Sequence, residues 1–348
     1  MSTQPHEIGV AVAAYGSASR VFHVPLLQTI PGLALRAVVN RRPDDVRAAL
    51  PHTKVLPDFA ALCADPDVEL VVIPTPNDTH APLAAQALAA GKHVVVDKPF
   101  TLTLAEARGL LDLARARGRV LSVFQNRRWD ADFLTMRKVI ESGAIGEPVH
   151  LESRFDRFRP QVPDRWRDRA GPGSGLWYDL GPHLVDQALQ LFGPPRAIYL
   201  DLAVQRDGAT TDDRFHALLR YDRLRVVLHA STLAAAETPR FELHGTRGSY
   251  VKYGLDSQEE SLKAGGLPGA SGWGRDRREG TLTTASGSSA RVPNVAGDYR
   301  RYYLALRDAL RGTGSNPVSA EEALAVMTVI ERGRLSSEAR RERSIDLG

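Results

Sequence analysis

The chain is poor in cysteine, in long apolar runs and in blocks of like charge, and each shortage excludes a class of protein. Its 348 residues contain one cysteine, Cys63, which excludes an intrachain disulfide framework and any zinc site built from several cysteines. No apolar run reaches the roughly 18 residues that a bilayer-spanning helix needs. The stretch Met1–Ile8 is too polar for the apolar core of a signal peptide. We therefore expect a cytoplasmic protein.

Charge is nearly balanced, with 45 basic against 41 acidic residues and a net charge of +4. No basic block is interleaved with aromatic residues, so nucleic-acid binding is not expected. Hydrophobic residues make up 43% of the chain, an ordinary share for a globular protein. The length allows two domains, each with its own core.

Strand and helix patterns alternate through the first 125 residues. Six apolar or β-branched runs predict strands: Ile8–Ala14, Leu35–Val39, one near Val55, Leu70–Ile73, His93–Val96 and Val120–Phe124. Five segments between them predict helices: Arg20–Thr29, Pro43–Leu50, Phe59–Ala64, Thr79–Ala90 and a helix from the capping box Thr103/Glu106 to Arg117. This alternation is typical of a doubly wound parallel sheet of the dinucleotide-binding kind, a Rossmann domain.

The pattern changes after residue 125. Strand-like runs follow one another closely: Val149–Arg157, Ala197–Val204, Arg214–Tyr221, Arg225–Ser231, Phe241–Gly245 and Ser249–Tyr253. Consecutive strands favour a mostly antiparallel open sheet in a C-terminal α+β domain. The expected helices are Asp130–Ser142, a helix opened by Pro182 and running through Val185–Phe192, Val295–Arg311 and Ser319–Arg340, while Gly265–Ser289 is expected to be irregular. We predict a nucleotide domain at 1–125 and a substrate and oligomerisation domain at 126–348, with the closing helices 295–340 packing back on the first.

The first strand-to-helix turn is a candidate pyrophosphate cradle. A glycine-rich turn lets the backbone approach the phosphates at a helix N-terminus. The turn Tyr15-Gly16-Ser17 keeps only the middle glycine of that signature, so an ordinary tight turn remains an alternative.

The end of the second strand predicts which dinucleotide is bound. An acidic residue there would meet a ribose 2′-hydroxyl, whereas arginine accommodates a 2′-phosphate. The sequence has Asn40-Arg41-Arg42, with no carboxylate before Asp44. Because a dianionic phosphate fits two arginines, we predict NADP(H) rather than NAD(H).

Two further strand ends carry polar residues. Thr75, Asn77 and His80 follow the fourth strand, and Asp97-Lys98-Pro99 follows the fifth. Ligands bind outside the carboxyl ends of the strands in such sheets, so we expect cofactor contacts here. Helix capping by Asn77 or Asp78 and a simple strand-end ion pair at Asp97-Lys98 are the alternatives.

A second group of reactive residues lies at Trp177–His183. Asp179 and His183 are four residues apart and would share one face of a helix. Proximity to the helix N-terminus would keep His183 neutral near pH 7, and a neighbouring carboxylate would orient its ring. A packed histidine at a helix start is the alternative. No metal site is expected, because His216, His229 and His244 stand singly on predicted strands.

These residues together resemble the Gfo/Idh/MocA family of nicotinamide-dependent oxidoreductases, over nearly the whole length. The resemblance is strongest to NADP-dependent scyllo-inositol 2-dehydrogenases. The motifs that carry it are the Tyr15-Gly16 turn, Phe22–Leu26, Thr75-Pro76-Asn77, Asp97-Lys98-Pro99, Ser122–Asp130, Phe155–Pro160 and Trp177–His183. Ala14 and Ser19 stand where the family has glycines, and Asp97 stands where it usually has glutamate.

The resemblance implies a catalytic trio of Lys98, Asp179 and His183, acting with NADP(H). His183 would exchange the proton of a substrate hydroxyl, Lys98 would stabilise the developing alkoxide, and Asp179 would orient His183. It further implies that the cofactor is contacted by residues of the strand ends and by Gln125 and Trp166. Candidate substrate contacts are Arg127, Arg128, Phe158 and Tyr178, with packing or ion pairing as the alternative for each.

The expected substrate is a polyol or cyclitol similar to scyllo-inositol. A sugar or diol dehydrogenase of the same family, or a sensor that binds nicotinamide nucleotide without catalysis, stays open. Family members usually associate through an open face of the C-terminal sheet, which implies a homodimer or homotetramer.

Overall fold

The structure is a computed structural model, which describes residues 6–347 apart from the side chain of Trp166. The chain forms two compact units. Unit 1 comprises the chain up to Asn126, with Gln258–Trp273 and Asp298–Leu324. Unit 2 comprises Arg127–Ser257, Gly274–Gly297 and the chain from Ala325 onward.

Unit 1 is built on a six-stranded parallel sheet in the order β3-β2-β1-β4-β5-β6. Its strands are β1 (Ile8–Val12), β2 (Leu33–Val39), β3 (Lys54–Leu56), β4 (Leu70–Ile73), β5 (His93–Val96) and β6 (Leu121–Val123). The order reverses direction between β1 and β4, which creates the crevice where doubly wound sheets bind ligands. The predicted Rossmann arrangement is confirmed.

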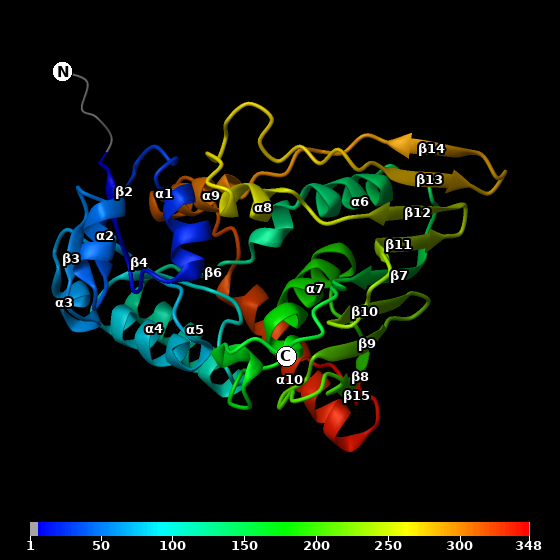
Figure 1. Cartoon of the computed structure of the whole chain (residues 1–348), viewed down its shortest axis with the longest axis horizontal. Coiled ribbons are helices and arrows are strands. Elements are labelled where there is room, and N and C mark those ends of the chain that lie inside the picture. Colours follow the sequence, from blue (N-terminus) through cyan, green and yellow to red (C-terminus); the bar gives the residue numbers. More distant parts are fainter. Residues whose placement is uncertain (1–5, 348) are drawn as a thin grey trace. The chain divides into compact units, whose positions relative to one another are not determined.

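Helices cover this sheet, and α4 and α5 lie side by side (Figure 1). The helical segments of unit 1 are η1, a short π-helix (Ser19–His23), α1 (Val24–Leu27), α2 (Pro43–Ala49), α3 (Phe59–Ala64), the 3₁₀ turn η2 (Asn77–Thr79), α4 (His80–Ala89), α5 (Leu104–Arg117), α8 (Gln258–Lys263) and α9 (Arg300–Leu310). The capping box predicted from Thr103 and Glu106 opens α5, because each side chain bonds a backbone N–H that the helix leaves unpaired.

Unit 2 is built on a nine-stranded sheet in the order β14-β13-β12-β11-β7-β10-β9-β8-β15. Only β7 and β10 pair in parallel, and the other neighbours are antiparallel. The strands are β7 (Pro148–Arg154), β8 (Ala197–Ala203), β9 (Arg214–Arg220), β10 (Arg225–Ser231), β11 (Pro239–Gly245), β12 (Gly248–Tyr253), β13 (Gly280–Thr284), β14 (Ser289–Val292) and β15 (Arg343–Ser344). This confirms the predicted α+β domain on a mostly antiparallel sheet.

Helices pack on one face of the second sheet. Trp177 is 1% exposed, and its ring lies 5.0 Å from that of Phe215 on β9. A Cβ at Gly333 would come within 2.9 Å of the Trp177 ring, so a glycine permits this close approach of two helices. The helical segments are η3 (Asn126–Trp129), α6 (Ala131–Glu141), η4 (Trp166–Asp168), α7 (Leu176–Phe192) and α10 (Ala320–Ala339), of which η3 and α10 continue from unit 1 into unit 2.

Two expected elements differ in the structure. The segment Gly265–Ser289, expected to be irregular, contains β13 and the first residue of β14, which form an antiparallel hairpin. Their sequences, Gly-Thr-Leu-Thr-Thr and Ser-Ala-Arg-Val, lack the apolar alternation that marks a half-buried strand, although β13 is mostly half-buried and only β14 is mostly exposed. The helix expected from Val295 begins at Arg300, and the Val295 N–H bonds the Thr135 hydroxyl.

No helix within residues 6–347 combines the length and the hydropathy that crossing a membrane requires.

Candidate active site

The turn after β1 leaves space next to its single glycine. Gly16 and Ser17 are exposed, Tyr15 is half-buried, and the N–H of Ala13 bonds Val72 O of β4 at 2.8 Å. A Cβ built on Gly16 meets nothing within 4 Å. Neither packing nor an unusual φ therefore explains this glycine. The open space fits the close backbone approach that a pyrophosphate needs.

Two exposed arginines follow β2 at the same edge of the sheet, since β2 pairs in parallel with β1. The Asn40 Oδ1 accepts the N–H of Arg42 at 3.2 Å, and Arg42 Nε lies 3.4 Å from Asp45. Arg41 makes no ion pair with any of residues 6–347. An unengaged guanidinium next to the β1 turn fits a ribose 2′-phosphate.

The loops after β4 and β5 are tied together by His80. The ring is 1% exposed, with Nδ1 2.7 Å from Pro99 O and Nε2 2.9 Å from Thr75 O. Burial lowers the pKa of His80, and a neutral ring donates to only one of these carbonyls at a time. His80 therefore links the two loops through their backbone carbonyls. Of the other residues predicted in the loop after β4, Thr75 is half-buried and Asn77 is 8% exposed.

Asp97 is held by a buried pair that the sequence did not suggest. His23 Nε2 lies 3.5 Å from Asp97 Oδ2, and His23 Nδ1 lies 2.6 Å from the Tyr303 hydroxyl. With its proton on Nε2, facing the carboxylate, His23 accepts from Tyr303 at Nδ1. Burial alone would raise the pKa of Asp97, but His23 and the nearby Lys98 outweigh it and lower that pKa. The carboxylate next to Lys98 is therefore ionised and fixed in place.

Lys98 and Gln125 complete the carboxyl edge of the first sheet. Lys98 is half-buried, its N–H bonds Asp97 Oδ1 at 2.7 Å, and its bond to Pro99 is cis. Gln125 is 2% exposed, and its buried Oε1 has no hydrogen-bond partner among residues 6–347. A buried amide oxygen without a partner is costly unless a ligand satisfies it. This observation, with the space at Gly16, fits a bound dinucleotide.

In unit 2, Asp179 and His183 lie one turn apart on α7, as their spacing predicts. The expected start of this helix at Pro182 is wrong, because α7 begins at Leu176 and Pro182 lies inside it. The first two backbone amides of α7 donate to a residue that is distant in the sequence. The Leu176 N–H donates to Asp212 O and the Trp177 N–H donates to Asp212 Oδ2. Asp179 belongs to the first turn, but His183 lies in the second. The helix dipole acts mainly within the first turn, so the effect of the helix N-terminus that the sequence suggested for His183 does not follow from this position.

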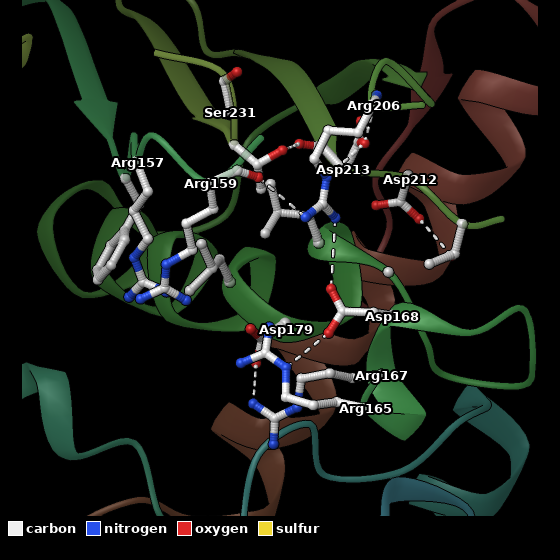
Figure 2. A pocket seen from close by; sticks show the side chains of 16 residues that line it. Arg157, Arg159, Arg165, Arg167, Asp168, Asp179, Arg206, Asp212, Asp213 and Ser231 are labelled. Atoms are coloured by element: carbon white, nitrogen blue, oxygen red, sulfur yellow. Dashed lines mark hydrogen bonds and ion pairs between the residues drawn. The ribbon is translucent and has the colours of Figure 1, made fainter. Parts of the chain in front are cut away.

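A pocket in unit 2 has the Asp179 side chain in its lining (Figure 2). The carboxylate is 23% exposed and lies 3.4 Å from Arg167 Nη1. His183 is 6% exposed. The pocket also contains Asp212, whose pKa burial raises to about 6, against the backbone hydrogen bonds from Trp177 and its neighbours.

The residues predicted to contact substrate occupy different environments. Arg128 forms two hydrogen bonds with Asp186, at 2.6 and 2.9 Å, and both side chains are buried. Arg127 is likewise buried, 3.4 Å from Asp130 and over the Phe155 ring.

The other two candidates are more accessible. Phe158 is 58% exposed and does not line the pocket with Asp179. Tyr178 is half-buried, and burial raises its pKa, with Arg334 acting in the opposite direction. Trp166 belongs to η4, and its side chain lies outside the described part of the chain.

Sequence reasoning missed His23 and Tyr303, which are 280 residues apart, and the arginines Arg157 and Arg159 of the pocket. One feature of the sequence could have identified the two arginines. Alternate residues of an extended segment point to the same side, so Phe155, Arg157 and Arg159 share one side of the segment and Phe158 lies on the other. Among residues 6–347, no three His, Cys, Asp or Glu side chains are grouped to hold a metal ion.

Comparisons with known proteins match both units. A family model described as "Oxidoreductase family, NAD-binding Rossmann fold" matches residues 8–125, and one described as "Oxidoreductase family, C-terminal alpha/beta domain" matches residues 137–347. The chain is 53% identical over 336 residues to the uncharacterized oxidoreductase YdgJ of Escherichia coli, covering 96% of this chain and 97% of YdgJ.

Two further relatives were found. One is the scyllo-inositol 2-dehydrogenase (NADP(+)) IolW of Bacillus subtilis, 38% identical, with 96% of this chain and 95% of IolW covered. The other is the crystal structure of an oxidoreductase from Bacillus cereus, 32% identical, with a TM-score of 0.89 and coverage of 97% and 99%.

Proposed function

Because the chain belongs to the Gfo/Idh/MocA family of oxidoreductases, we propose that it is an NADP(H)-dependent dehydrogenase or reductase acting on the carbinol carbon of a polyol or cyclitol. The observation that carries the proposal is the open space beside Gly16 at the switch point of the sheet, with Arg41 at the end of the next strand. The printed name of the Bacillus subtilis relative supports both the phosphorylated cofactor and a cyclitol substrate.

The cofactor would be held by residues at the carboxyl edge of the first sheet. Gly16 and its neighbours Tyr15 and Ser17 would meet the pyrophosphate, and Asn40, Arg41 and Arg42 would meet the phosphorylated ribose. Further contacts are assigned to Thr75, Asn77, His80, Asp97, Lys98, Gln125 and Trp166. The bound dinucleotide supplies hydride transfer at nicotinamide C4.

Three side chains are assigned to proton transfer and charge stabilisation. His183 accepts the proton of the substrate hydroxyl during oxidation and returns it during reduction. Asp179, one turn away on α7, orients the imidazole and offsets its charge when it is protonated. The Lys98 ammonium stabilises negative charge as it develops on the substrate oxygen.

The experiment that tests this function follows NADPH absorbance at 340 nm with a panel of inositols, inososes and sugars. We expect turnover of at least one cyclitol, with NADP(H) preferred over NAD(H). The variants Lys98→Met and His183→Ala should each lower kcat by on the order of 10²-fold or more. Arg47→Ala, an exposed change on α2, serves as the control.

Two outcomes would contradict the proposal. Tight NADPH binding without turnover of any alcohol or ketone would favour a nucleotide sensor. Near-normal kcat in Lys98→Met or His183→Ala would remove these residues from the mechanism.

A further inference from the structure

The pocket that Asp179 lines is rich in arginine. Five arginines and four aspartates line this pocket, which is open to solvent, and all of them belong to unit 2 (Figure 2). Three of the aspartates have arginine partners: Asp213 with Arg206 at 3.0 Å, Asp168 with Arg165 at 2.9 Å and Asp179 with Arg167 at 3.4 Å. Guanidinium groups therefore outnumber carboxylates in this pocket.

The fourth aspartate is committed to the backbone. Asp212 Oδ2 accepts the Trp177 N–H at 2.7 Å, at the beginning of α7. Arg159, by contrast, is exposed and makes no ion pair within residues 6–347. The excess positive charge of the pocket thus includes a guanidinium that is available to a ligand.

The arginines after β7 are aligned by strand geometry. The N–H groups of Phe155, Arg157 and Arg159 bond carbonyl oxygens of His229, Ser231 and Thr232 at 2.9, 2.9 and 2.7 Å. Alternate residues of an extended segment point to the same side, and these three all line the pocket. The Arg157 guanidinium also lies 4.8 Å from the centroid of the Phe155 ring, which fixes its orientation.

Arg206 fixes the backbone that carries Arg159. Its Nη1 donates to the carbonyl oxygens of Arg159 and Gln161 at 3.3 and 3.2 Å, and its Nε donates to Asp213 at 3.0 Å. Arg206 is 8% exposed. Because the buried Arg206–Asp213 ion pair is bonded to this backbone, the arginines after β7 are held in position before any ligand binds.

We infer that this pocket binds an oxyanion carried by the substrate, a carboxylate or a phosphate, and that Arg159 contacts it. Planar guanidinium groups match both oxyanions with paired hydrogen bonds. The inference rests on the proposed function, because Asp179 lines the same pocket. It predicts that, among polyols and sugars, compounds carrying an acidic group are preferred over their neutral analogues.

The test compares matched neutral and anionic compounds. Glucose, glucuronate and glucose 6-phosphate are assayed as substrates with NADP⁺, and the binding of the same three compounds is measured by titration calorimetry without cofactor. We expect glucuronate or glucose 6-phosphate to exceed glucose in kcat/KM and in affinity by about tenfold or more, with the advantage shrinking as salt is added. The two anions separate a carboxylate site from a phosphate site.

Variants assign the effect to the pocket. Arg159→Gln should raise the KM and Kd of the preferred anion about tenfold and leave those of glucose unchanged, while Arg159→Lys should retain part of the affinity. Arg223→Gln removes an exposed arginine of unit 2 outside the pocket and is the matched control. Because Arg159 is exposed, melting curves should show that its variants fold normally.

The possible failures can be told apart. Anion binding that depends on Arg159, without turnover of any compound, would contradict the proposed function and keep the oxyanion site. Turnover of neutral polyols with no anion preference, and no effect of Arg159→Gln, would overturn the site and keep the function.

Discussion

Arg41 should determine the choice between NADPH and NADH. It is exposed and next to the β1 turn, and it has no ion-pair partner within residues 6–347. A hydrogen bond to a charged group contributes about 1.5–3 kcal/mol, which corresponds to roughly 10- to 150-fold in affinity. Because solvent screens an exposed guanidinium, we take the lower limit and expect Arg41→Ala to weaken NADPH binding about tenfold.

The measurement is a fluorescence titration with NADPH and with NADH, at low and at high salt. NADH affinity should be unchanged in Arg41→Ala, and the NADPH affinity of the wild type should fall with salt toward that of the variant. Arg42→Ala should have a smaller effect, because Arg42 is already paired with Asp45. Arg47→Ala on α2, where Arg47 pairs with Asp44, controls for the loss of one positive charge. Equal losses for NADPH and NADH, or no loss for either, would refute the assignment of the 2′-phosphate.

Three further predictions concern Gly16, Tyr303 and Asp212. Gly16→Ala should keep the melting temperature, because the added Cβ would meet no protein atom within 4 Å. The same Cβ would occupy the space proposed for the pyrophosphate, so NADPH binding should weaken about tenfold; a loss of stability with unchanged affinity would contradict this. Tyr303→Phe should cost about 1–3 kcal/mol in urea unfolding because it leaves the buried His23 Nδ1 unpaired, and an unchanged free energy of unfolding would exclude that bond. The folded-state pKa of Asp212 is raised from 3.8 to about 6, so its contribution to stability is present below about pH 4 and is lost as pH rises to about 6. Asp212→Asn should therefore be more stable than the wild type above pH 6, by up to about 3 kcal/mol, and this gain should vanish near pH 4; a gain independent of pH would refute the assignment.

Local sequence signals were sufficient for the first sheet. The β-branched run His93–Val96 and the capping box at Thr103 act through neighbouring residues, and the parallel order places Gly16 and Arg41 at one edge. The resemblance to the Gfo/Idh/MocA family is confirmed over both units.

Features that depend on residues far apart in the sequence could not be predicted in the same way. Proline usually occupies the first turn of a helix, so Pro182 suggested a start that is six residues too late. The true start of α7 is stabilised by Asp212, which is separated from Trp177 by 35 residues. Likewise, the arginine pocket combines the segment after β7, the η4 region and Arg206. The motif Phe155–Pro160 supplies part of this lining, but nothing in the local sequence shows that η4 and Arg206 join it.

The two positions where the family has glycines are linked in this chain. The Ser19 hydroxyl donates to Ala14 O, and Ser19 is fully buried. A side-chain hydrogen bond therefore closes the turn that glycines would otherwise shape by their backbone freedom. Arg20 N–H bonds Gly16 O at 3.0 Å within the same turn, so the loop is held from both sides. Ala14 and Ser19 thus preserve the form of the turn without glycines at these two positions. Gly16 is different: no protein atom lies near its Cβ position, so a side chain there would meet the proposed cofactor.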